Sequence, residues 1–162
     1  MLGGFHFNDR RYADDDLTLG SIDPYRVFRI FHEIFSFEWE TGAPPDIAHA
    51  DIAFMIDQSH NLKGKIEAMI QTVSMAQQLF AKAALVDYER LEAAQKLPDL
   101  IRAESCLQDA FATDVRPAIA EWRGSKGLPQ DPLDAFRQSG YLERITAERA
   151  GRNPSGVTAY AF

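Results

Sequence analysis

Apolar and polar residues follow two different periods near the start of the chain. Phe5, His6 and Phe7 alternate as residues of a β-strand do, so we expect the histidine on the face opposite the two phenylalanines. Over residues 24–38, apolar side chains recur every three or four positions, which predicts an amphipathic helix with Asp23 as its N-cap.

A short, continuous apolar run at residues 53–56 predicts a second strand, buried on both faces. Residues 62–86 then show the apolar spacing of a long helix. The order strand, helix, strand, helix is that of a βαβ unit with parallel strands. Residues 87–162 continue as shorter helices and a tail rich in glycine, proline and serine. These patterns predict an α/β protein with a helical C-terminal extension.

Four polar side chains fall where the two predicted strands end. His6 lies on the first strand, Asp14 and Asp16 follow it, and Asp57 comes directly after the second. In parallel α/β folds the chemistry sits at the carboxyl ends of the strands. An imidazole with nearby carboxylates suits a divalent cation such as Mn2+, Mg2+, Co2+ or Zn2+. On composition alone, an aspartate-rich segment is also typical of a solvated or helix-capping loop, and this alternative stays open.

Composition narrows the class of protein. The chain has 162 residues, of which 46% are hydrophobic and 25% charged, which is ordinary for one globular domain. Its net charge of −7 argues against binding to nucleic acid or to an anionic membrane. Cys106 is the single cysteine, so no internal disulfide or thiolate metal cluster is expected, and its place in a helical pattern near Leu107 and Ala110 predicts a buried structural thiol. Since there is no apolar run of membrane length and no signal peptide, we expect a cytoplasmic protein.

Two long segments carry a family resemblance. GFHFNDRRYADDDLTLGSIDPYRVF and MIDQSHNLKGKIEAMI resemble the C-terminal part of the L-rhamnose isomerases, in the branch that also converts other aldoses. The pieces DVRPAIAEWR and DPLDAFRQSGYLERI are similar to that family too. This family belongs to the xylose isomerase-like TIM barrel superfamily. The resemblance implies an α/β fold in which residues 1–86 form the last two β/α units of an incomplete (β/α)8 TIM barrel. Residues 87–162 would then be C-terminal helices that contact other subunits of a homotetramer.

The resemblance also implies a site for two divalent metal ions, with Mn2+ as the first expectation and Co2+, Mg2+ or Zn2+ as alternatives. His6 and Asp57 match ligands of a structural metal that holds substrate hydroxyls, and Asp57 is also the candidate catalytic residue. Asp14 and Asp16 match ligands of the catalytic metal.

Two residues just beyond Asp57 complete the candidate site. Ser59 matches a position near the substrate in the family. For His60 two interpretations stay open. It either contacts and orients the ligand Asp57 without binding the metal itself, or it shapes the turn.

The implied reaction is the isomerisation of L-rhamnose to L-rhamnulose by a hydride shift between C1 and C2. The metals polarise the sugar oxygens, and water on a metal moves the hydroxyl proton. The alternatives are the same chemistry on L-mannose, L-lyxose or D-allose, or a truncated remnant without catalytic activity.

The chain departs from the family pattern in one respect. The family's remaining metal ligands, a glutamate, an aspartate and a second histidine, come from earlier strands than those seen here. Met1 is therefore expected to be an internal methionine of a longer protein. We expect the 162-residue chain alone to fold poorly, to bind metal weakly and to leave sugars unconverted.

Overall fold

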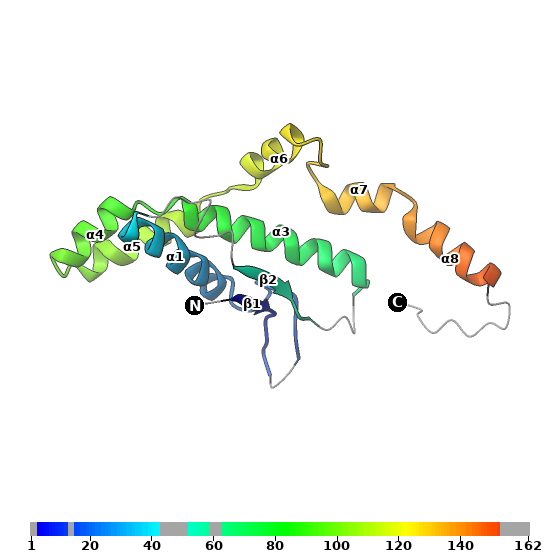
Figure 1. The fold of residues 1–162 in the computed structure, drawn as a ribbon, viewed down its shortest axis with the longest axis horizontal. Coiled ribbons are helices and arrows are strands. Elements are labelled where there is room, and N and C mark those ends of the chain that lie inside the picture. Colours follow the sequence, from blue (N-terminus) through cyan, green and yellow to red (C-terminus); the bar gives the residue numbers. More distant parts are fainter. Residues whose placement is uncertain (1–2, 13–14, 43–51, 59–62, 153–162) are drawn as a thin grey trace.

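The structure is a computed structural model that describes residues 3–12, 15–42, 52–58 and 63–152. Its elements follow one another as two strand–helix pairs and then a run of helices (Figure 1). In chain order they are β1 (Gly4–Phe7), α1 (Pro24–Thr41), β2 (Ala53–Ile56), α3 (Lys65–Ala84), α4 (Tyr88–Lys96), α5 (Leu100–Ala112), α6 (Arg116–Ser125), α7 (Pro132–Gln138) and α8 (Tyr141–Arg152). Asp23 caps α1 as predicted, because its carboxylate accepts a hydrogen bond from the Arg26 N–H at 3.0 Å.

The two strands lie side by side in a parallel sheet, with His6 opposite Met55. A glycine is required at position 4 because the strands approach closely there. A Cβ on Gly4 would lie 2.7 Å from the carbonyl oxygen of Ala53. The predicted parallel pairing of the two strands is therefore confirmed.

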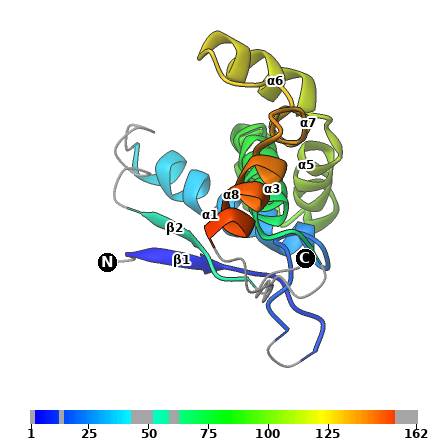
Figure 2. The same cartoon turned by 90° about the vertical axis from the view of Figure 1, so that its right-hand side faces the viewer.

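Helices α1 and α3 lie on the same side of this sheet (Figure 2). The rings of Phe7 and Phe54 stack 5.8 Å apart on that side, and the Phe7 ring is 5.4 Å from that of Phe31 on α1. Phe31 in turn meets Phe80 of α3 edge to face. His6 is exposed on the opposite face, as its alternation with the phenylalanines predicted.

The predicted fold class was wrong. In the described part of the chain the sheet has two strands and is accompanied by seven helices, and these elements do not form part of a (β/α)8 barrel. Helices α4 to α8 leave the sheet instead of returning to it (Figure 1). The barrel was implied by the family resemblance, and the order of apolar patterns did not test it because any βαβ unit followed by a helix shows that order. Two strands are also too few to close a sheet around an axis.

The burial predicted for the second strand was also wrong. Phe54 and Met55 are 41% and 44% exposed, whereas the apolar run predicted a strand buried on both faces. A strand is buried on both sides only when other elements cover both faces of its sheet. Here the two helices cover one face, and β2 lies at an edge.

The core lies between α1 and α3 and continues into the α4–α5 hairpin. Phe28 is fully buried and its ring meets Phe111 of α5 edge to face at 5.4 Å. Cys106 is buried in the same core, as expected for a structural thiol. The buried apolar cluster consists of Phe7, Leu19, Val27, Phe28, Phe31, Ile34, Leu79, Ala83, Val86, Leu91, Cys106 and Ala110.

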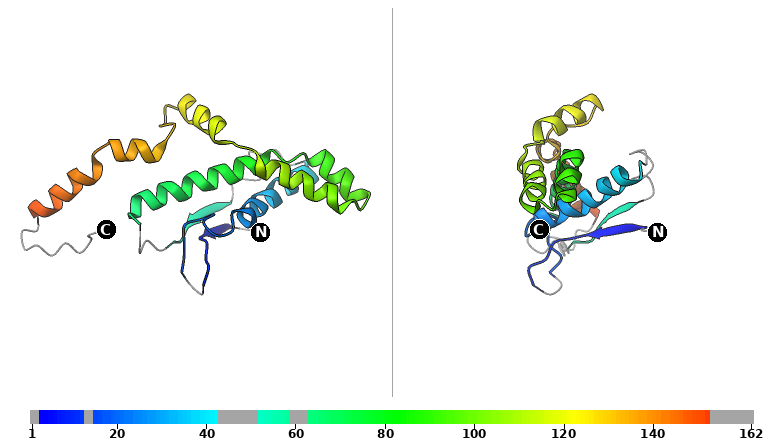
Figure 3. Two further views of the ribbon diagram at one scale, coloured as in Figure 1. Left: turned by 180° about the vertical axis from the view of Figure 1, so that it is seen from behind. Right: turned by 90° about the vertical axis from the view of Figure 1, so that its left-hand side faces the viewer.

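Helices α6, α7 and α8 form an arm that runs back past α3 and ends beyond it (Figure 3). Neither α7 nor α8 contains a buried residue. A subunit contact through this arm stays a prediction. Among the described helices, none has the length and apolar character needed to cross a lipid bilayer.

His32 of α1 is buried against Tyr88 at the start of α4. Its Nδ1 lies 3.0 Å from the Tyr88 hydroxyl, and the two rings stack 5.5 Å apart. Burial lowers the pKa of His32 below its ordinary value of 6.5, while the charge of Glu33 raises this pKa and that of Arg29 lowers it. The folded chain therefore favours the neutral imidazole.

We expect this histidine to make the chain less stable in acid. Between pH 6.5 and the lowered pKa of His32, the unfolded chain binds a proton at this residue that the folded chain does not bind. The stabilisation is thus complete above pH 6.5 and is lost as the pH falls through the lowered pKa. The His32→Phe variant keeps a ring against Tyr88, so its melting temperature should vary less between about pH 8 and about pH 5. Equal slopes for the variant and the parent chain would contradict this assignment.

Candidate metal-binding face and its supporting loop

His6 and Asp57 meet on the sheet face that the helices leave open. The Asp57 N–H donates to the carbonyl oxygen of Phe7 at 3.0 Å, which extends the ladder by one residue and fixes the carboxylate beside β1. His6 Nδ1 lies 3.7 Å from Asp57 Oδ2, and the two side chains are 64% and 65% exposed. The parallel register thus brings together two residues that are far apart in the sequence.

This pair fits two ligands of one divalent cation. Metal–nitrogen and metal–oxygen bonds of about 2.1 Å each can span a gap of this size. An imidazole nitrogen and a carboxylate oxygen are also the donors that Mn2+, Zn2+ and related cations accept. Because both side chains are exposed, the pair alone would hold a cation weakly. It supplies half or less of a coordination shell.

The other predicted site residues are placed only in part. Asp16 lies in the loop after β1, where its Oδ1 accepts a hydrogen bond from Asn8 Nδ2 at 2.7 Å. Its φ of +41° is in the left-handed region, which aspartate tolerates better than most residues. Asp14, Ser59 and His60 lie outside the described residues. Within the described residues, no three or more histidine, cysteine, aspartate or glutamate side chains gather as a metal site. The shared site of all the candidates therefore stays a prediction.

Asp9 organises the loop that carries the aspartates, and the sequence analysis missed it. Its backbone pairs with that of Leu17 in an antiparallel bridge, with bonds of 2.9 and 2.5 Å. Its Oδ2 also accepts hydrogen bonds from the N–H groups of Ile22 and Asp23, at 2.7 and 3.0 Å. One residue thus closes the loop on both sides and joins it to the start of α1. An aspartate after a strand is ordinary loop composition, so only the fold reveals this role.

Two further contacts attach the loops after both strands to α3. The Thr72 hydroxyl, fully buried on α3, donates to Gln58 Oε1 at 2.5 Å and so holds the residue after Asp57. Lys63 Nζ donates to Thr18 Oγ1 and to Gln71 Oε1, each at 3.0 Å. Lys63 therefore links the aspartate loop to the second loop and to α3.

The same loop contacts α3 through a glycine. Gly20 has a φ of +72°, and a Cβ there would lie 2.7 Å from Met75 Cγ on α3. Any larger residue at position 20 would both strain the backbone and push the loop off the helix.

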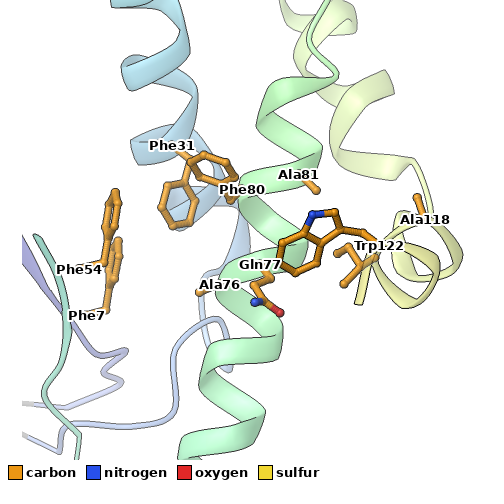
Figure 4. A pocket seen from close by; sticks show the side chains of 10 residues that line it. Phe7, Phe31, Phe54, Ala76, Gln77, Phe80, Ala81, Ala118 and Trp122 are labelled. Atoms are coloured by element: carbon orange, nitrogen blue, oxygen red, sulfur yellow. The ribbon is translucent and has the colours of Figure 1, made fainter. Parts of the chain in front are cut away.

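An apolar cavity of about 680 Å³ lies on the other side of the sheet (Figure 4). Phe7, Phe54 and Phe31 line one side of it and Trp122 of α6 lines another. Gln77 and the indole N–H of Trp122 are the polar side-chain groups among its lining residues. A sugar needs hydrogen-bond partners for its hydroxyls, so the chemistry of the open face with His6 and Asp57 suits it better.

Two curated proteins are similar to nearly the whole of this chain. No family model matches the chain. A probable sugar isomerase of Mesorhizobium japonicum is 43% identical over 148 residues, which is 91% of this chain and 33% of the relative. A probable sugar isomerase of Rhizobium meliloti is 42% identical over 148 residues, with the same coverage of both chains. The chain therefore spans about a third of the length of these curated relatives. It is homologous to that part of proteins named as sugar isomerases.

Proposed function

We propose that this chain forms part of a metal-dependent aldose–ketose isomerase that interconverts L-rhamnose and L-rhamnulose. The observation that carries the proposal is the 43% identity over nearly the whole chain to a probable sugar isomerase. The pairing of His6 with Asp57 supports the dependence on metal. The choice of rhamnose rests on the resemblance of the HFND, DDD and DQSHN segments to L-rhamnose isomerases. L-mannose, L-lyxose and D-allose are the substrates to compare with it.

Each residue has a defined task in this proposal. His6 and Asp57 would hold one metal ion, and Asp14 and Asp16 would hold the other. When bound, a divalent metal polarises sugar oxygens and lowers the pKa of water beside it. The Asp57 carboxylate would attract the cation electrostatically, and the His6 imidazole 3.7 Å away would supply a nitrogen ligand. Asp9 would keep the loop after β1 closed, so that the Asp16 carboxylate in this loop stays at the carboxyl end of the strand.

A chimeric protein gives a direct test. This chain replaces the matching third of the Mesorhizobium japonicum relative, so the rest of that protein supplies further ligands. We expect the chimera to convert L-rhamnose to L-rhamnulose, to lose this activity when metal is removed with EDTA, and to regain it with Mn2+. The 162-residue chain alone is expected to show no turnover, because two exposed ligands hold a cation weakly. The measurement is the ketose formed from each of the four aldoses.

The unmodified relative is the control for folding and assay conditions. If the relative isomerises an aldose while a folded chimera converts none of the four, the proposed activity of this chain is wrong. If the chimera prefers L-mannose, L-lyxose or D-allose, the isomerase stands and the choice of L-rhamnose is wrong. If activity persists fully after metal removal, the assignment of His6 and Asp57 as metal ligands is wrong.

A further inference from the structure

Arg123 is a buried cation on a helix that carries none of the proposed metal ligands. It lies on α6 and is 9% exposed. Its guanidinium donates to the carbonyl oxygen of Gln130 at 3.3 Å, to Ser74 Oγ at 3.5 Å and to Gln77 Oε1. All three acceptors are neutral, and no carboxylate of the described residues forms an ion pair with this arginine. Burying a charge without a counter-charge is costly, so the site favours a negative group.

The same arginine lines a cavity of about 550 Å³ between α3, α6 and the start of α7. Arg116 is a second cation on its wall and forms a two-pronged ion pair with Asp114, with both bonds at 2.8 Å. Asp131 is the one acid among the lining residues, and its Oδ1 is engaged as the cap of α7. Since Asp114 compensates Arg116, Arg123 is the positive charge of this wall that has no ion-pair partner among the described residues, in a chain whose net charge is −7.

The remaining polar wall suits an oxyanion. Hydroxyl and amide groups of Ser74, Gln71, Gln78 and Gln130 line the cavity beside the arginines. A guanidinium has five N–H donors in a planar fork, so donors remain on Arg123 beyond its bonds to the protein. Because Nη2 makes two of these bonds and Nη1 makes one, the Nε–H and one Nη1–H remain to donate charge-assisted hydrogen bonds to the oxygens of a phosphate or carboxylate group.

We propose that this cavity binds a small oxyanion, a phosphate or a carboxylate group, on Arg123. The bound group compensates the buried charge and joins three helices, because Arg123 already contacts α3 and the segment before α7. Binding would therefore fix the α6–α7 part of the arm against α3. None of the proposed metal ligands lines this cavity, although Gln71 and Met75 on its wall also contact the loops that support the proposed isomerase site.

The test titrates the folded chimera with inorganic phosphate and, separately, with acetate, followed by calorimetry and by thermal melting. Sodium chloride at equal ionic strength is the reference. We expect saturable binding of at least one of the two anions and a melting temperature above that in chloride. Binding of phosphate alone assigns a phosphate site, and binding of acetate assigns a carboxylate site. Responses to both anions equal to that in chloride would overturn the proposal.

Variants locate the binding. Arg123→Gln removes the charge and should raise the dissociation constant at least about tenfold, since charge-assisted bonds are about twice as strong as neutral ones. Gln78→Glu keeps Arg123 and the size of the side chain but adds a negative charge to the wall, so it should weaken binding even where Arg123→Gln disturbs folding. Arg90→Gln, which removes an exposed arginine paired with Asp109, is the control and should bind as the parent does. If the parent, Arg123→Gln and Gln78→Glu bind equally, the anion sits elsewhere and the proposal is wrong.

Discussion

Asp16→Asn in the chimera is expected to abolish sugar turnover while a metal ion stays bound at His6 and Asp57. The substitution removes the charge of a proposed ligand of the catalytic metal. It keeps the side-chain oxygen that accepts from Asn8, and asparagine tolerates the φ of +41° at this position. The loop should therefore keep its conformation. The measurements are the rate of ketose formation and the metal content of the purified protein.

The metal content decides how the ligands are divided. We expect the variant to lose one of the two metal ions and to retain the other. Loss of both ions together would show that the assignment of residues to two sites is wrong. Asp15→Asn is the matched control, since the Asp15 carboxylate accepts from the N–H groups of Arg11 and Tyr12 at the tip of the loop. That variant should keep both metals and most of the turnover, because the parent's Asp15 carboxylate bonds the backbone of the turn and is not a proposed metal ligand.

Short-range patterns predicted the local structure well. The alternation around His6 placed this residue on the open face, and Asp23 marked the start of α1. Both features depend on residues within one strand or one helical turn, where side-chain period and capping act directly on the backbone. The burial of Cys106 was predicted in the same way, since its neighbours on α5 place it on the buried side of the helix.

The wider architecture did not follow from these patterns. Apolar periods show which face of an element is buried, but they do not show how many further elements cover it. For this reason the run 53–56 indicated a strand correctly and its burial wrongly. The barrel came from the family resemblance, and the two-stranded sheet with its seven described helices does not reproduce it.

The supports of the candidate site depend on contacts between distant residues. Thr72 holds Gln58 across 14 positions of the sequence, and Lys63 reaches Thr18 across 45. The sequence does not reveal the hydrogen bond from Thr72 to Gln58, because a threonine on the apolar side of a helix is expected only to pack in the core. The pairing of His6 with Asp57 could be anticipated, since parallel strands bring their carboxyl ends to one edge.

Asp9→Ala is expected to lower the turnover of the chimera by about a hundredfold, although Asp9 is not a proposed ligand. A misplacement of reacting groups by about 1 Å can cost this much. Without the carboxylate, the N–H groups of Ile22 and Asp23 lose their acceptor, and the loop is released at the end that joins α1. Asp16 lies within this loop, so its carboxylate should no longer be held at the end of the sheet. Steady-state rates and metal affinity measure the effect.

The control separates a positioning role from a general loss of stability. Asp99→Ala removes a carboxylate that accepts from the N–H of Arg102 at the start of α5, far from the sheet. Loss of such a cap costs about 1 kcal/mol of folding free energy, and turnover should be unchanged. Asp9→Asn retains one side-chain oxygen as an acceptor and should fall between the parent and Asp9→Ala in rate. If Asp9→Ala and Asp99→Ala are destabilised alike and both keep full turnover, Asp9 stabilises the loop without positioning the aspartates.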